Sequence, residues 1–224
     1  MTLPPDSMDL DELRIALSPL LGNHAAFDGW SPKMLASAAG ELGVPADRAA
    51  LAFPGGAADM IDGWFASLDA AMALGLPAER LASMKIRERI YILVMFRLEW
   101  LLGNREALRR ALAVLAMPQN LLAAARLAWR AADLMWRAAG DTATDFNHYS
   151  KRSILIGVYA SSTLVFLDDS SEDLEQTRAF LKRRIDDVMR FEKAKMSWRA
   201  TREKLPSLSR FLGRLRYPQP DKRY

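Results

Sequence analysis

Apolar residues recur every three to four positions through most of the 224-residue chain, and charged residues fill the positions between them. This spacing is typical of amphipathic helices, and no segment alternates apolar and polar residues as a half-buried strand does. Several prolines fall where the pattern stops or restarts, as expected at helix ends. The sequence therefore predicts an all-α protein with helices near residues 7–21, 31–40, 45–52, 56–74, 77–83, 85–103, 104–116, 118–140, 144–168, 171–197 and 205–216.

Residues 31–56, SPKMLASAAGELGVPADRAALAFPGG, place two short helical segments around the turn ELGVP, as in a helix-turn-helix. Residues 1–70 carry a net charge of −7, whereas DNA binding depends on basic side chains that neutralise phosphates. The second helical segment offers Asp47 and Arg48 beside mostly Ala and Leu, a poor set for contacting bases. We therefore expect a scaffold head that binds no nucleic acid, with sequence-specific DNA binding as the alternative.

The stretch DDSSEDLEQTRAFL marks the start of the last long helix. Ser170 is expected to cap it, with Asp173 and Glu175 in the first turn near the positive end of the helix dipole. Adjacent carboxylates diverge on a helix, so capping and solvation explain Asp168 and Asp169 better than acid–base catalysis does.

Enzyme chemistry is scarce in this sequence. The absence of cysteine excludes disulfides, thiolate zinc sites and cysteine nucleophiles. The two histidines, His24 and His148, form no Glu-x-x-His pair of the kind that diiron bundles use. Gly-rich nucleotide fingerprints, Walker motifs and nucleophile elbows are also missing. We predict a protein that is not an enzyme and has no catalytic residues, metal site or cofactor.

The basic charge gathers at the carboxyl end, where residues 193–224 carry a net charge of +8. Within them, LPSLSRFLGRLRYP places leucines and a phenylalanine on one helical stripe with arginines outside it. Such a segment suits an anionic membrane surface, and the alternative is a terminal helix that packs on protein. The candidate membrane-binding residues are Leu208, Arg210, Phe211, Leu212, Arg214 and Leu215.

No spanning helix is expected, because the longest relevant uncharged runs are 15 residues long and a span needs about 20 apolar residues. The acidic start MTLPPDSMDLDEL lacks the features of a signal peptide. We expect a cytoplasmic protein that associates peripherally with the inner membrane through its basic end.

Two segments in the second half of the chain are unusually rich in apolar residues. NLLAAARLAWRAADLMWRAAG, residues 120–140, sets small residues beside large aromatics, and KRSILIGVYASSTLVFLDD, residues 151–169, is apolar on nearly every side. Such a combination can leave a gap between helices for a hydrophobic ligand, or it can form a tightly packed core. The candidate lipid-binding residues are Trp129, Met135, Trp136 and Tyr159.

Residues 139–195 carry an ordered set of motifs: AGD, then DFNHYSKR, then FLDDSSEDLEQTRAFLKRRI. With these motifs the chain resembles the ubiquinone (coenzyme Q) biosynthesis protein nine family, whose members have a TetR-like fold. The resemblance implies a TetR-like helical bundle in three parts. These are a helix-turn-helix-like head at 1–55, a bundle for lipid binding and dimerisation at 56–197, and a C-terminal amphipathic, membrane-associating tail at 198–224.

The resemblance also implies a function. The chain is expected to be a lipid-binding accessory protein of ubiquinone biosynthesis, which takes a polyprenylated quinone precursor from the membrane and presents it to the demethoxyubiquinone hydroxylase. A phospholipid is the other lipid considered. The alternative function is a ligand-responsive transcriptional regulator of the TetR type, against which the acidic head argues.

The resemblance further assigns a partner surface to the stretch DFNHYSKR. Family members usually carry Trp-Tyr where this chain has His148 and Tyr149, so the tryptophan is replaced. The candidate partner-binding residues are His148, Tyr149, Lys151 and Arg152, and the alternative for Tyr149 is a half-buried aromatic at a helix start. Because TetR-like folds pair through their last bundle helices, we also expect a homodimer formed by 144–168 and 171–197.

Overall fold

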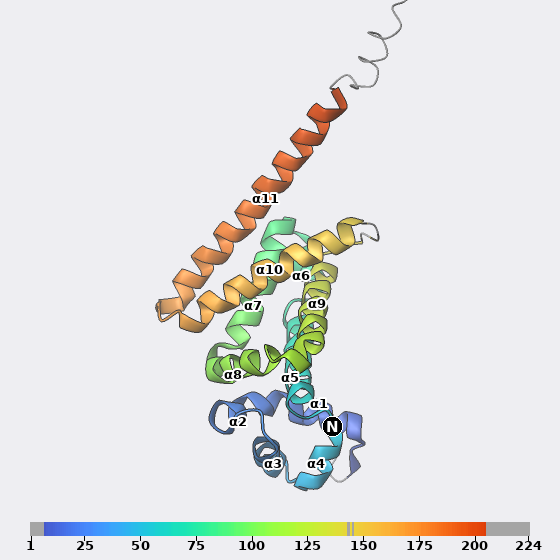
Figure 1. Cartoon of the computed structure of the whole chain (residues 1–224), viewed down its shortest axis with the longest axis vertical. Coiled ribbons are helices and arrows are strands. Elements are labelled where there is room, and N and C mark those ends of the chain that lie inside the picture. The colour runs from blue at the N-terminus through green and yellow to red at the C-terminus, as the bar shows by residue number, and fades with distance from the viewer. Residues whose placement is uncertain (1–6, 143, 145, 205–224) are drawn as a thin grey trace, which may run out of the picture. The chain divides into compact units, whose positions relative to one another are not determined.

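The computed structural model describes the backbone of residues 7–142, 144 and 146–204, and the side chains of these residues except 146 and 191–204. Within those residues every regular element is a helix, which confirms the all-α prediction (Figure 1). The α-helices are α1 Leu10–Leu17, α2 Leu21–Asp28, α3 Pro32–Glu41, α4 Ala46–Ala52, α5 Gly56–Gly75, α6 Ala78–Ala82, α7 Ile86–Trp100, α8 Arg105–Leu115, α9 Leu121–Ala138, α10 Phe146–Asp168 and α11 Glu175–Lys204. Short 3-10 turns are η2 Ser18–Leu20, η3 Leu102–Asn104, η4 Pro118–Asn120 and η5 Glu172–Leu174.

The chain divides into two units, Met1–Lys182 and Arg183–Tyr224. Every site described below lies in the first unit. The helix predicted at 205–216 and the six candidate membrane-binding residues, from Leu208 to Leu215, lie outside the described residues.

The helix-turn-helix pair predicted at 31–40 and 45–52 is confirmed as α3 and α4, which pack against each other. The Ser31 hydroxyl accepts a hydrogen bond from the backbone N–H of Met34 and so caps α3, and Pro32 occupies its first turn. Gly43 in the connecting turn has φ +69°, a conformation that favours glycine.

The helix predicted at 7–21 corresponds to α1 and η2, and the prediction missed the next helix, α2, which ends at Asp28. Residues 21–28, LGNHAAFD, contain weak helix formers and give little periodic signal. Gly22 is required by packing: a Cβ there would lie 2.6 Å from Nε1 of Trp64. A contact with a distant helix therefore selects a residue that disfavours helix locally.

The head and the bundle share one core within the first unit. The Trp30 ring centroid lies 5.2 Å from that of Trp64 on α5, and the Trp30 indole N–H donates to the carbonyl of Ala107 on α8 at 3.1 Å. Helix α2 also packs along α8. Burial of both tryptophans, each of which contributes a large apolar area, fastens the head to the bundle.

The predicted cap in the turn between α10 and α11 was wrong. The buried Asp169 carboxylate, rather than Ser170, accepts hydrogen bonds from the N–H and hydroxyl of both Ser171 and Thr177, at 2.5–2.9 Å. Asp173 lies in a left-handed conformation with φ 50°, so it is not in a helical first turn. Exposed Asp168 pairs instead with Arg109, which confirms that these adjacent carboxylates serve capping and solvation.

No single helix among the described residues is long and apolar enough to cross a membrane. Two consecutive helical segments, Leu102–Leu115 and Pro118–Ala138, are together long and apolar enough to span a membrane. They are bent by 94° relative to each other.

Candidate functional site

A cavity of about 400 Å³ lies between five helices of the first unit, α5, α7, α8, α9 and α10. Three alanines of α9, Ala124, Ala128 and Ala131, contribute little side-chain volume to its wall. Of the two packing alternatives left open by the sequence, the structure therefore shows a gap between helices. The lining residues are Phe65, Asp69, Arg97, Leu108, Leu112, Leu115, Ala116, Leu121, Ala124, Leu127, Ala128, Arg130, Ala131, Ile156, Tyr159, Ala160, Thr163 and Leu164.

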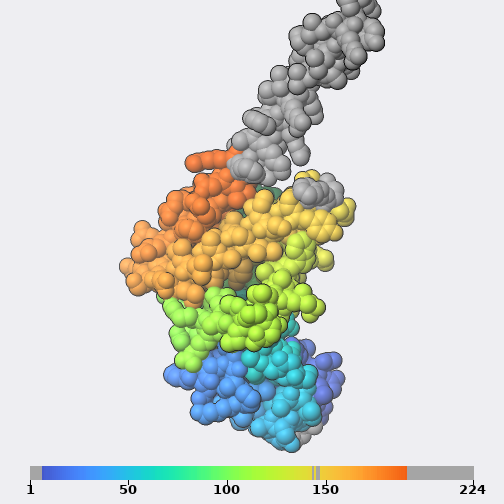
Figure 2. All heavy atoms as spheres, in the orientation of Figure 1, coloured from blue at the N-terminus to red at the C-terminus, as the bar shows by residue number. Residues whose placement is uncertain are grey.

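One side of the cavity is open and apolar. Leu121 at the start of α9 is 57% exposed and Leu164 on α10 is 62% exposed, although both line the cavity. Met117 and Leu122 beside Leu121 in the sequence are exposed as well. Figure 2 shows α8, α9 and α10 side by side on one face of the first unit. Exposed apolar residues at the mouth of an apolar cavity are suited to a hydrophobic ligand.

Another part of the lining is polar. Asp69 on α5 forms ion pairs with Arg97 of α7 and with Arg130 of α9, the latter at 3.0 Å. The guanidinium carbon of Arg97 lies 5.3 Å from the ring centroid of Tyr159 on α10. Burial opposes the charge of Arg97, but Tyr159 and Asp69 outweigh burial and raise its pKa, so the guanidinium is cationic.

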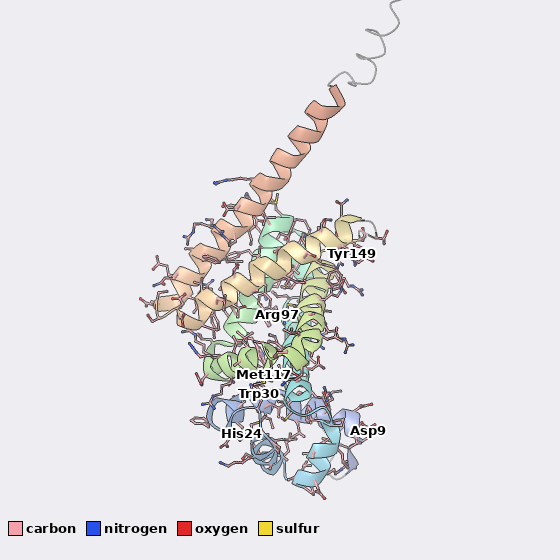
Figure 3. The ribbon with its side chains drawn as sticks, viewed as in Figure 1. Asp9, His24, Trp30, Arg97, Met117 and Tyr149 are labelled. Carbon is pink, nitrogen blue, oxygen red and sulfur yellow. The ribbon has the colours of Figure 1, made fainter. Side chains whose placement is uncertain are left out.

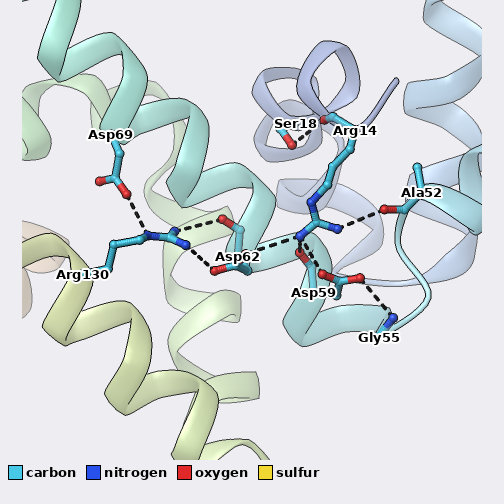
Figure 4. Close-up of polar contacts among 8 residues, drawn as sticks. All are labelled: Arg14, Ser18, Ala52, Gly55, Asp59, Asp62, Asp69 and Arg130. Carbon is cyan, nitrogen blue, oxygen red and sulfur yellow. Dashed lines mark hydrogen bonds and ion pairs between the residues drawn. The ribbon is translucent and has the colours of Figure 1, made fainter. Parts of the chain in front are cut away.

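The ion pairs continue toward the head. Arg130 also pairs with Asp62 at 2.6 Å, and Arg14 of α1 pairs with Asp62 at 3.4 Å and with Asp59 at 2.6 Å (Figure 4). Three arginines and three aspartates from four helices thus alternate in a connected network.

Of the four candidate lipid-binding residues, the structure places only Tyr159 in the cavity lining. Met135 is fully buried outside that lining, and the indole N–H of Trp136 donates to the carbonyl of Lys151 at 3.0 Å. Trp129 lies beside His148 and Tyr149, with ring centroids at 6.1 and 5.9 Å.

The polar lining residues Asp69, Arg97 and Arg130 were not among the candidates predicted from the sequence. The sequence does contain an indication of these ion pairs, because Arg97 and Arg130 lie within the apolar stretches YILVMFRLEW and LAWRAADLM. A charged residue in an apolar helical stretch usually has a buried partner.

The four candidate partner-binding residues come together in the first turns of α10, and they differ in exposure. Tyr149 is 60% exposed, so it is not a half-buried aromatic, and its ring centroid lies 5.1 Å from that of His148 (Figure 3). Together with Trp129 these rings form an aromatic cluster at the start of α10.

The other two candidates form ion pairs. Lys151 pairs with Asp141 at 2.6 Å, and its amine lies 5.4 Å from the ring centroid of Trp136. Arg152 is only 1% exposed and pairs with Asp133 at 2.7 Å and with Asp141 at 3.1 Å. Arg152 therefore fastens α10 to α9 from inside the fold.

Among the described residues no group of three or more histidine, aspartate and glutamate side chains could hold a metal ion.

Comparisons with known proteins agree with this architecture. The model of the COQ9 family matches residues 121–192, which include α9, α10 and the start of α11. The mitochondrial ubiquinone biosynthesis protein COQ9 of Rattus norvegicus is 32% identical over 172 residues, covering 72% of this chain and 54% of that protein. Its counterpart in Homo sapiens is 41% identical over 93 residues, covering 42% of this chain and 29% of that protein.

The match with the rat protein thus spans about half of that protein's length. A solved structure, the TetR transcriptional regulator from Nitrosomonas europaea, has a TM-score of 0.63 and 24% identity, covering 79% of this chain and 97% of that chain. This likeness shows the fold alone, and the fold is TetR-like and all-α. By the family model and these relatives, the chain belongs to the COQ9 family.

Proposed function

We propose that this chain is a lipid-binding accessory protein of ubiquinone biosynthesis. It takes a polyprenylated quinone precursor from a membrane and presents it to the demethoxyubiquinone hydroxylase. The observation that carries this proposal is the apolar cavity of about 400 Å³ that opens between the exposed side chains of Leu121 and Leu164.

The size of the cavity suits part of such a lipid. Pockets for small molecules have volumes of roughly 300–1,000 Å³, so the cavity holds a quinone-like head and the first part of a tail. The rest of a long polyprenyl tail leaves through the mouth, where exposed leucines provide apolar contact. The names of the rat and human relatives support the pathway, since both are called ubiquinone biosynthesis proteins.

Presentation to the hydroxylase is assigned to the aromatic cluster Trp129, His148 and Tyr149. Helix α10 carries Tyr149 at its start and Tyr159 in the cavity wall, about 15 Å further along the helix axis. A partner that binds at Tyr149 therefore lies within reach of a ligand in the cavity. Lys151 and Arg152 support this surface through their ion pairs with Asp141.

Membrane contact is assigned to residues 198–224, on the strength of their basic and apolar sequence pattern. Through this segment the chain would associate peripherally with an anionic membrane surface. We also propose that two chains form a homodimer through α10 and α11.

Lipid binding is tested with a matched pair of substitutions on α9. Ala128→Phe fills the cavity, and Ala125→Phe adds the same ring on the exposed side of the same helix. We expect Ala128→Phe to weaken binding of a short-chain ubiquinone at least about tenfold, and Ala125→Phe to leave it unchanged. Equal binding by both variants in fluorescence titrations would contradict a cavity site.

Presentation is tested by replacing the exposed ring with Tyr149→Ala. We expect its affinity for the hydroxylase to fall about tenfold or more while its thermal stability stays the same, because exposed aromatics at interfaces often dominate binding. Phe27→Ala, which removes an exposed aromatic from the head, serves as the control. Unchanged affinity of the Tyr149→Ala variant in biolayer interferometry would place the partner surface elsewhere.

The alternative function, a TetR-type transcriptional regulator, requires that the helix-turn-helix-like head bind DNA. On α4, Asp47 is exposed, and Arg48 donates to the carbonyl of Met8. With the net charge of −7 over residues 1–70, we expect no binding to DNA at physiological salt. A mobility shift with a discrete operator, abolished by Arg48→Ala, would favour the regulator.

A further inference from the structure

Two guanidinium groups line the cavity, and they differ in how fully they are paired. Arg130 directs Nε to Asp69 at 3.0 Å, one terminal nitrogen to the Asp62 carboxylate at 2.6 Å and the other to the Asp62 carbonyl at 3.2 Å. Each of its three nitrogens therefore has a partner. Arg97 pairs with Asp69 through one terminal nitrogen, and its Nε has no hydrogen-bond partner.

The unpaired donor is buried. Arg97, labelled in Figure 3, is 1% exposed and belongs to the cavity lining, and its Nε is itself buried. A buried donor without a partner is unfavourable, and a hydrogen bond to a charged donor stabilises more than a neutral one. An acceptor atom brought by a ligand would satisfy this donor.

The charge around the donor indicates which kind of acceptor fits. The network comprises Arg14, Asp59, Asp62, Asp69, Arg97 and Arg130. Three positive and three negative side chains balance, so the site has no excess charge for an anion to neutralise. A phosphate group would bring an uncompensated charge into a low-dielectric cavity, which is costly. A neutral oxygen does not carry this cost.

We propose that Arg97 is the head-group residue of the cavity and binds a neutral oxygen of a quinone-like or phenolic lipid head, with Tyr159 beside it. This inference rests on the proposed lipid-binding function and adds the residue that binds the head group and the orientation of the ligand. Phospholipid head groups are then disfavoured in this position.

The orientation follows from the difference in exposure between the lining residues. Leu121 at the mouth is 57% exposed, whereas Arg97 in the polar lining is 1% exposed. The lipid therefore enters head first, and its head reaches Arg97 while the tail extends past Leu121 and Leu164.

The test compares three probes on the full chain: a short-chain ubiquinone, squalene as a hydrocarbon without a head, and phosphatidylglycerol in detergent solution. Wild type should prefer the ubiquinone to both others. Arg97→Lys keeps a cation opposite Asp69 but removes the Nε donor, so it should weaken ubiquinone binding by on the order of tenfold and leave squalene binding unchanged.

Two further variants guard against a folding defect. Arg126→Lys changes an exposed arginine of α9 that lies outside the cavity lining, so the preference for ubiquinone over squalene should persist. Tyr159→Phe removes only a hydroxyl beside Arg97, and a smaller loss that is specific to ubiquinone is expected. Thermal melts of all variants check that each is folded.

The outcomes separate the two proposals. If wild type binds squalene and ubiquinone equally well, or if Arg97→Lys and Tyr159→Phe weaken both probes alike, the head-group assignment is wrong and the lipid-binding function stands. If phosphatidylglycerol binds best and depends on Arg97, the site takes a phosphate and the neutral-head assignment is wrong. If wild type binds no probe, the proposed function itself fails, and the assignment fails with it.

Discussion

At the scale of single residues, buried ion pairs and caps hold the helices that form the site. Arg152 connects α10 to Asp133 on α9 and to Asp141 in the following loop. Asp169 fixes the turn before α11, which contains the left-handed residues Asp173 and Leu174. Left-handed non-glycine residues cost free energy and persist only where other contacts determine them.

Arg152→Ala should reduce the free energy of unfolding by about 1.5–3 kcal/mol, because it removes a buried guanidinium that pairs with Asp133 and Asp141, while Arg137 and Lys151 still pair with these carboxylates. Lys151→Ala, at a partly exposed position in the same turn, should cost only about 1 kcal/mol or less. Urea unfolding at neutral pH measures both. Similar small losses in the two variants would show that Arg152 is not a structural anchor and would return it to the partner surface.

Asp169 predicts a pH dependence. Hydrogen bonds from Ser171 and Thr177 outweigh the effect of burial and hold the pKa of its carboxyl well below the usual range. The charged form therefore stabilises the fold above the unfolded pKa of about 4, and this contribution is lost as pH falls further.

Asp169→Asn should accordingly reduce the free energy of unfolding by about 1.5–3 kcal/mol at pH 7 and by less at pH 3. Asp168→Asn, which changes the exposed neighbour, is the control and should have little effect at either pH. A constant difference between wild type and Asp169→Asn across this range would contradict the assigned cap.

At the scale of elements, helix positions followed from periodicity, whereas some boundaries and caps depended on distant contacts. Helix α2 escaped prediction because Gly22 is chosen by Trp64, which lies far away in the sequence. Ser170 looked like a cap from its position, yet Asp169 holds the turn through its contacts with Thr177. The local sequence pattern does not show which residues make these long-range contacts, so it could not predict these boundaries and caps.

The basic tail is an element whose role is argued from sequence. Replacing Leu208, Phe211, Leu212 and Leu215 by Ser removes the apolar stripe, and each such side chain contributes roughly 1.5–3 kcal/mol when buried, so liposome binding should become undetectable.

Charge should matter less in the tail. Replacing Arg210, Arg214 and Arg216 by Gln should weaken binding only to anionic liposomes, by about 1 kcal/mol per arginine at low salt. If flotation shows the Ser variant bound as well as wild type, the tail packs on protein and lipid reaches the cavity by another route.

At the scale of the whole molecule, the COQ9 family and the TetR-like fold were accessible from the sequence through ordered motifs around residues 139–195. From the sequence, a cavity could be predicted only as one of two packing alternatives. Its polar lining could not be predicted, because Asp69, Arg97 and Arg130 come from three helices that meet only in the folded chain. The spacing of apolar residues does not specify which charged residues meet across helices.

The proposed homodimer is a property of this scale. Light scattering at micromolar concentration should give twice the mass of one chain, since the last bundle helices α10 and α11 are the expected interface. A single-chain mass over this concentration range would exclude the dimer and confine the proposed function to the monomer.

Mass spectrometry of the lipids extracted from the purified 224-residue chain shows whether the cavity carries a ubiquinone precursor. We expect wild type to carry a polyprenylated quinone precursor, Ala128→Phe to lose it, and Ala125→Phe to retain it. An extract that holds no isoprenoid quinone, or that is the same for wild type and Ala128→Phe, would contradict the claim that this cavity carries a ubiquinone precursor.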